Sequence, residues 1–106
     1  MQEPNQSILS TVRATLSMWP GVKEGTKLGL VGFRVRRKYF LLCTEEALVF
    51  ASLPPAQWKK AARMYGATVF VHQGKEYKNW CQIACRSRAE LIFLEFLIQE
   101  SYNAAR

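Results

Sequence analysis

The chain has 106 residues, of which 49% are hydrophobic and 12% aromatic, and its formal net charge is +7. This length fits one domain with one core, covering residues 1–106, and the composition excludes an intrinsically disordered chain. The fifteen Lys and Arg residues outnumber eight Glu, with no Asp, so the surface should attract polyanions, although charge that only maintains solubility would give the same composition.

The amino-terminal part of the chain predicts a helix and no targeting segment. Residues 1–6 lack the basic flank and apolar run of a signal peptide, which favours a cytoplasmic protein. Apolar residues recur at helical spacing over residues 7–18, and the Pro-Gly pair at 20–21 ends this helix. Gly25 and Gly29 then predict a loop that leads to the first strand.

The middle of the chain predicts a hairpin, a third strand and a second helix. The hairpin strands are expected at residues 30–36 and 39–44, with the turn at 37–38, and the third strand at 47–52. Proline is tolerated in the first helical turn, so the Pro-Pro pair predicts a helix over residues 54–65. The basic residues of this helix should face solvent.

The last third of the chain predicts a second hairpin and a long apolar helix. Strands are expected at residues 68–72 and 80–86, with a loop at 73–78, and Ser87 and Glu90 form a capping box. The following helix is apolar on nearly all sides, so it should be buried against the sheet and another helix. Together the segments predict one compact α+β domain, with an antiparallel sheet of about five strands, an N-terminal helix, a middle helix and a buried C-terminal helix.

The most informative segment is residues 33–40, where apolar and basic side chains alternate. This period of two makes one face of the strand apolar and the other cationic. A basic hairpin of this kind can follow a phosphate backbone or enter a groove of a nucleic acid. The second hairpin is also basic. The predicted nucleic-acid contacts on the two hairpins are Arg34, Arg36, Arg37, Lys38, Lys75 and Lys78.

No arrangement of residues predicts catalysis or a cofactor. A Ser-His-Asp triad is impossible without Asp, and His72 is the single histidine. Glu45 and Glu46 are adjacent, so on an extended segment they would point to opposite faces and could not act as paired carboxylates. The glycine-rich loops that bind phosphates are absent. We therefore expect no catalytic residues and no cofactor.

The three cysteines, Cys43, Cys81 and Cys85, are expected to be free thiols in a reducing compartment. A zinc site built from these thiols and His72 has the correct number of ligands. However, residues 81 and 85 on one strand would lie roughly 13 Å apart, too far to share an ion with bonds of about 2.3 Å. The same separation excludes a disulfide between them. No metal site is predicted.

Several short motifs resemble, in their order and spacing, those of the MmcQ/YjbR-like family over most of the chain. They are Pro20-Gly21-Val22-Lys23-Glu24-Gly25-Thr26, Phe33-Arg34-Val35-Arg36 with Lys38 and Phe40, Leu53-Pro54-Pro55, Trp80, and Tyr102-Asn103-Ala104-Ala105. The resemblance implies a CyaY-like α/β fold with two hairpins in a double-wing DNA-binding arrangement, and it implies no catalytic residues. The chain departs from the family at the first hairpin turn, where it has Arg37-Lys38 and many similar sequences have Gly-Lys.

The sequence therefore predicts a non-enzymatic nucleic-acid-binding module, with DNA favoured over RNA. Sequence specificity should be weak, because no recognition helix is identified. The alternative is a protein- or small-molecule-interaction domain, in which the open sheet face or a groove beside Trp58 and Trp80 receives the partner. A polyanion would be favoured if the charges of residues 34–38 and those of Lys75 and Lys78 share one surface without interleaved glutamates. A deep apolar pocket beside them would favour a ligand. The oligomeric state stays open, with a monomer favoured.

Overall fold

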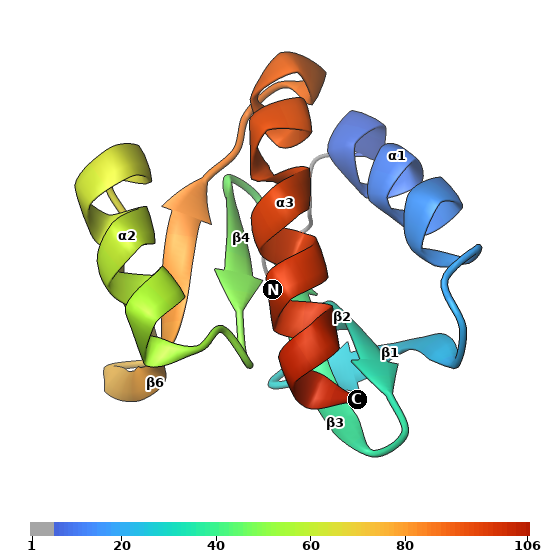
Figure 1. Cartoon of the computed structure of the whole chain (residues 1–106), viewed down its shortest axis with the longest axis horizontal. Coiled ribbons are helices and arrows are strands. Elements are labelled where there is room, and N and C mark those ends of the chain that lie inside the picture. Colours follow the sequence, from blue (N-terminus) through green and yellow to red (C-terminus); the bar gives the residue numbers. More distant parts are fainter. Residues whose placement is uncertain (1–5) are drawn as a thin grey trace.

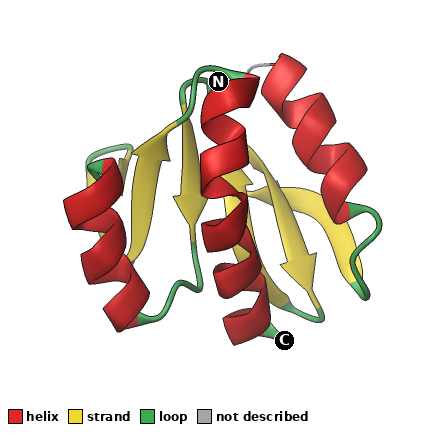
Figure 2. Ribbon diagram, turned by 45° about the horizontal axis from the view of Figure 1, so that its top comes forward, coloured by secondary structure: helices red, strands yellow, loops and turns green. Residues whose placement is uncertain are grey.

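The computed structural model describes residues 6–106 as an α+β domain with a six-stranded antiparallel sheet in the order β1-β2-β3-β4-β6-β5. The elements are α1 (Gln6–Leu16), β1 (Val22–Lys27), β2 (Leu30–Val35), β3 (Lys38–Cys43), β4 (Ala47–Phe50), α2 (Pro55–Tyr65), β5 (Thr68–His72), β6 (Lys75–Ala84) and α3 (Arg88–Ala105). Figures 1 and 2 show the three helices on the same side of the sheet, with α3 between α1 and α2. The predicted fold class is confirmed.

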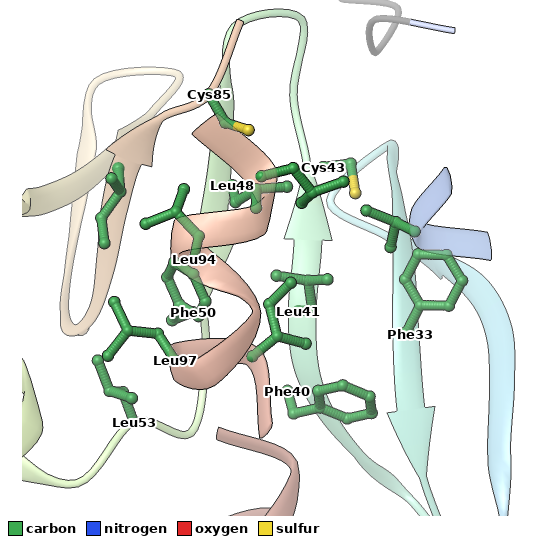
Figure 3. Close-up of a cluster of buried hydrophobic side chains, with 14 of the residues drawn as sticks. Phe33, Phe40, Leu41, Cys43, Leu48, Phe50, Leu53, Cys85, Leu94 and Leu97 are labelled. Carbon is green, nitrogen blue, oxygen red and sulfur yellow. The ribbon is translucent and has the colours of Figure 1, made fainter. Parts of the chain in front are cut away.

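The main core lies between the sheet and its covering helices. Along β2, Phe33 and Val35 are buried in this core and Arg34 lies on the opposite face, which confirms the predicted alternation. Figure 3 shows Leu94 and Leu97 of α3 beside apolar side chains of the strands. The buried residues that α1 and the central strands add to this core are Ile8, Leu9, Val12, Leu16, Phe40, Leu41, Leu48 and Phe50.

The α3 helix is buried on one side only, which corrects the expectation of apolar contacts on nearly all sides. Ile92 is 67% exposed and Phe93 is 69% exposed, whereas Leu94 and Leu97 are buried. A helix has 3.6 residues per turn, and the sheet and α1 cover only part of its circumference. Within residues 6–106, no helix is long and apolar enough to cross a membrane.

Residues 22–27 form the edge strand β1, although the sequence predicts a loop there. Gly25 pairs with Gly32 of β2, and a Cβ atom at either position would collide with the Tyr39 side chain. The two glycines therefore leave room for an aromatic ring above neighbouring strands, a role that glycine can have inside a strand. This additional strand is why the sheet has six strands rather than the predicted five or so.

The second hairpin has a short turn, so the predicted loop at residues 73–78 is wrong. β6 begins at Lys75, and the turn consists of Gln73 and Gly74, with φ angles of 52° and 79°. Two consecutive left-handed residues match the twist of a tight hairpin, so strand pairing can start immediately beyond the turn. Lys75 and Lys78 consequently lie on a strand.

A bulge in β6 bends this hairpin across the uncovered face of the sheet. The pairing passes from Cys81 opposite Val69 directly to Tyr77 opposite Phe70, which leaves residues 78–80 as the bulge. At the far end of the hairpin, Nε2 of His72 lies 3.0 Å from the carbonyl oxygen of Leu28, between β1 and β2. The end of β5 therefore meets the β1–β2 turn at the opposite edge of the sheet.

A second apolar cluster fills the space that the bent hairpin covers. Its aromatic members stack, with the ring centroids of Tyr77 and Trp80 5.0 Å apart. Nζ of Lys27 lies 5.5 Å from the Tyr39 ring centroid and 5.8 Å from that of Trp80. Trp80 is thus a packing residue of this cluster. The buried members of the cluster are Leu30, Leu42, Val49 and Phe70.

Candidate functional site

The first hairpin ends in a two-residue turn of Arg36 and Arg37, one residue earlier than predicted. Val35 pairs with Lys38 across the turn, and the two arginines and Lys38 are exposed. Arg36 has a φ of 58°, a left-handed conformation that costs a non-glycine residue about 1 kcal/mol. The tip of the hairpin therefore presents three cationic side chains to solvent on a strained backbone.

Arg34 stabilises the turn at this hairpin tip through a hydrogen bond to its backbone. Its side chain shares the sheet face opposite the main core with Tyr39 and Lys23, its cross-strand partners on β3 and β1. Nη1 of Arg34 donates a hydrogen bond of 2.6 Å to the carbonyl oxygen of Arg36. A guanidinium has five N–H donors, so Arg34 fixes the turn and still contributes charge beside it.

The strain at the tip predicts that Arg36→Gly stabilises the fold. The free energy of unfolding should rise by about 1 kcal/mol, because glycine adopts a φ of 58° without the Cβ clash. Urea denaturation followed by circular dichroism measures this change. Arg37→Gly is the matched control, since Arg37 has no positive φ, and it should not stabilise. Equal effects of the two changes would show that the strain is not relieved in this way.

A groove of about 560 Å³ opens beside the hairpin, between β3, the β4–α2 loop, α2 and the β6 bulge. Three lysines line it, namely Lys38 of β3, Lys59 of α2 and Lys78 of β6. Its apolar wall includes Pro54 and Trp58. No acidic residue of the described chain lines the groove, so its charge is uniformly positive.

The wall formed by the β4–α2 loop is fixed by the fully buried Ser101 of α3. Oγ of Ser101 donates a hydrogen bond of 2.7 Å to the carbonyl oxygen of Phe40 and accepts one of 3.1 Å from the backbone N–H of Ser52. Oγ of Ser52 in turn donates to the carbonyl oxygen of Tyr39 at 3.1 Å. Because Ser52 lines the groove, these bonds hold the groove wall against β3 and α3.

The α2 helix starts at the groove with incomplete hydrogen bonding. Its N-cap residue is Pro54, which has no side-chain hydrogen bond to the first-turn N–H groups. Oε1 of Gln57 and Nε1 of Trp58 are buried and have no hydrogen-bond partner within residues 6–106. The uncapped N-terminus adds positive potential to that of the three lysines.

The structure divides the six predicted contact residues between two places. Five of them lie around the hairpin tip and the groove, namely Arg34, Arg36, Arg37, Lys38 and Lys78. Lys75 lies elsewhere, because it pairs with His72 beside the β1–β2 turn, at the other end of β2. Its Nζ is 5.1 Å from the Tyr77 ring centroid. The end of the second hairpin therefore does not extend the charged surface of the first.

The glutamates of the described chain lie outside the first hairpin and the groove. Glu24 accepts hydrogen bonds of 2.6 and 2.9 Å from Arg13 of α1. Glu45 and Glu46 precede β4 at the end of the sheet opposite the Arg36 turn, and Glu76 is in the second hairpin. The remaining described glutamates are on α3, namely Glu90, Glu95 and Glu100. The basic residues at the hairpin tip and groove are not interleaved with carboxylates.

Two basic residues of this region were not predicted as contacts. Lys59 belongs to α2, whose basic residues were expected only to face solvent, and it lines the groove. Lys23 belongs to β1, which the sequence did not predict, and it lies beside Arg34. The Pro-Pro start of α2 is the local signal for Lys59, since it places that residue in the first two turns.

The three cysteines are free and buried, and their environment holds them as thiols. Burial raises the pKa of the Cys43 thiol to about 12 and the pKa of Cys81 and Cys85 to about 11. Among residues 6–106 there is no group of three potential metal-ligating side chains. At neutral pH the three cysteines are therefore protonated thiols and not reactive thiolates.

The raised thiol pKa values predict a loss of stability at alkaline pH. Between pH 9 and pH 11, Cys81 ionises in the unfolded chain and stays protonated in the folded one, so stability falls as pH rises. From pH 8 to pH 10, the wild type should lose roughly 1 kcal/mol more than Cys81→Ala, in which this thiol is removed. Urea unfolding at both pH values gives the difference. Identical losses would mean that Cys81 has an ordinary pKa.

Comparisons with protein-family models, curated proteins and solved structures give no match to this chain.

Proposed function

We propose that this domain is a non-enzymatic nucleic-acid-binding module that contacts phosphates through the β2–β3 hairpin and the adjoining groove. The observation that supports the proposal is the gathering of cations from three separate parts of the chain at one end of the fold. They are Arg36, Arg37, Lys38, Lys59 and Lys78. Such a cluster neutralises phosphates and releases their bound counterions, which drives association with nucleic acids.

The arrangement of charge separates this reading from a role in solubility alone. Charges that only maintain solubility are normally mixed in sign over the surface. Here the groove lining includes no carboxylate among the described residues, and Lys23 and Arg34 add two further cations beside the hairpin. The resemblance to the MmcQ/YjbR-like family implies the same function, with the difference that only the first of the two hairpin tips belongs to this charged surface.

The same features favour DNA and weak sequence specificity. The exposed tip is narrow, with two residues in its turn, so it can track a phosphate backbone or enter a groove of a duplex. Within residues 6–106, the one helix that adds a cation to this surface is α2, through Lys59, so few contacts to base edges are expected. The three free thiols fit a reducing, cytoplasmic environment.

The exposed side of α3 favours a second candidate, a protein-interaction module. Ile92, Phe93 and Phe96 are between 47% and 69% exposed on this helix. Neighbouring exposed apolar residues of this size commonly mark protein contacts. This function would leave the basic hairpin without a direct role, so the two candidates differ in which surface a mutation must alter to abolish binding.

Salt-dependent binding tests the proposal. Fluorescence anisotropy with labelled duplex DNA, single-stranded DNA and RNA of one sequence should show binding to nucleic acid at low salt, tightest for the duplex. With about five phosphate contacts, log K should fall with log salt at a slope of roughly −4.5 on duplex DNA. Tighter binding of RNA would reverse the preference for DNA. No measurable binding of any of the three at low salt would refute the proposal.

A further inference from the structure

The groove has more positive charge than an internal phosphate of a strand requires. Three lysines line it, and the uncapped N-terminus of α2 adds a further partial positive charge. A phosphodiester inside a strand carries one negative charge, whereas a terminal phosphate monoester carries about −1.5 to −2 at neutral pH. The groove therefore matches a terminal phosphate better than it matches the backbone.

The remainder of the groove suits the nucleoside that a terminal phosphate carries. Its wall combines Leu53, Pro54, Pro55 and the partly buried Trp58, which offers an indole beside the cationic end. Its volume of about 560 Å³ lies within the range of pockets that hold small ligands, roughly 300–1,000 Å³. An aromatic side chain next to cations is a common means of holding a base and its phosphate together.

The groove is also continuous with the hairpin tip. Lys38 lines the groove and directly follows Arg36 and Arg37 in the chain. In Figure 1, the β2–β3 hairpin and the start of α2 lie at the same, lower side of the molecule. A strand whose end occupied the groove would therefore meet the hairpin with its next phosphates.

From these features we infer that the groove binds a phosphorylated nucleotide, the end of a nucleic-acid strand with its terminal phosphate among Lys38, Lys59 and Lys78. The inference deepens the proposed function, since it adds a preference for a strand end at the groove to the general phosphate contacts of the hairpin and the groove. A free nucleoside monophosphate has the same chemistry as the terminal nucleotide. The two sources are separated experimentally.

The test compares one single-stranded oligonucleotide in three forms, with a 5′-phosphate, with a 3′-phosphate and with neither. One of the phosphorylated forms should bind about tenfold more tightly than the form without a terminal phosphate. Lys59→Gln should weaken binding of the phosphorylated strand about tenfold more than it weakens binding of the unphosphorylated strand, so that the two forms then bind equally. Lys60→Gln is the matched control, because Lys60 is the next residue of α2 and does not line the groove.

Competition with adenosine monophosphate identifies the source of the nucleotide. Displacement of the phosphorylated strand only at far higher concentrations of the mononucleotide than of the strand supports end binding. Binding of the mononucleotide as tight as that of the strand would overturn end binding in favour of a free nucleotide. Equal affinity for all three forms of the strand, with binding that still depends on salt, would overturn the inference and leave the proposed function intact. If the wild-type protein binds none of the three oligonucleotides but binds adenosine monophosphate through Lys59, the proposed function would be overturned instead.

Discussion

Replacing Leu97 by alanine should lower the free energy of unfolding by about 2–5 kcal/mol, whereas Phe93→Ala should change it by less than about 1 kcal/mol. Both residues lie on α3, one turn apart, and the effects of the two changes on helix propensity differ by only a few tenths of a kcal/mol (about 0.3). They differ in burial, since Leu97 is 1% exposed and Phe93 is 69% exposed. Leu97 points into the main core near Phe50 and Leu53, as Figure 3 shows.

Urea denaturation followed by circular dichroism measures both effects, and an unchanged dependence on urea concentration would confirm that each variant unfolds as the wild type does. Equal losses for the two variants at low protein concentration would contradict the orientation of α3. A loss for Phe93→Ala that appears only at high protein concentration would show that a second chain covers this side of the helix.

Patterns that are local in the sequence predicted their part of the fold correctly. The alternation around Arg34 placed Phe33 and Val35 in the core, because strand geometry alone turns successive side chains to opposite faces. The α3 helix begins after Ser87, whose Oγ accepts a hydrogen bond of 3.1 Å from the N–H of Glu90, as the capping box predicts. These features depend on residues no more than a few positions apart.

Features that depend on distant contacts were not predictable. Gly25 and Gly32 are typical loop signals, and their role in β1 and β2 becomes visible only when the Tyr39 side chain is placed above them. The exposed side of α3 has a sequence signal, since the polar residues Glu95, Gln99 and Asn103 lie together on one side of the helix and are exposed. Apolar residues over the rest of the helix outweigh this signal and predict burial on nearly all sides. Phe93 was accordingly predicted to be buried, and it is exposed.

At the candidate site, too, the features set by neighbouring residues were predictable and those set by distant contacts were not. The basic hairpin tip was predictable because its four cations are consecutive or nearly so in the sequence. A groove beside Trp58 was part of the alternative prediction, but the meeting of three lysines in it was not predictable. Lys38, Lys59 and Lys78 come from β3, α2 and β6, whose relative positions depend on the sheet order. Lys75 was grouped with Lys78 because they are near in sequence. However, Lys78 lies in the β6 bulge beside the groove, whereas Lys75 lies opposite His72 at the far end of the hairpin.

Changing Arg36 and Arg37 together to glutamine should weaken nucleic-acid binding about tenfold or more at low salt and at every sequence tested. Direct phosphate contacts release counterions, so the loss of two contacts should make the log–log salt slope shallower by about two units. Charges elsewhere act through long-range attraction, which is screened over about 8 Å at physiological ionic strength. The salt slope therefore distinguishes charges that contact phosphates from charges that act only through long-range attraction.

The matched control is the double change of Arg63 and Arg88 to glutamine. Arg63 lies in the last turn of α2 and Arg88 is the first residue of α3, and both are exposed. These helix ends lie at the opposite side of the molecule from the hairpin tip, as Figure 1 shows. The control removes the same charge, so any difference between the two variants reflects where the charge is placed.

The most direct test of phosphate binding by the β2–β3 hairpin is the salt slope of duplex-DNA binding for the wild type and these two variants. We predict a slope near −4.5 for the wild type and the Arg63 and Arg88 variant, and near −2.7 for the Arg36 and Arg37 variant. Urea unfolding of the same samples checks that each variant is folded. Equal slopes for the two variants would contradict the account, because the net charge of the protein, and not the hairpin, would then determine binding.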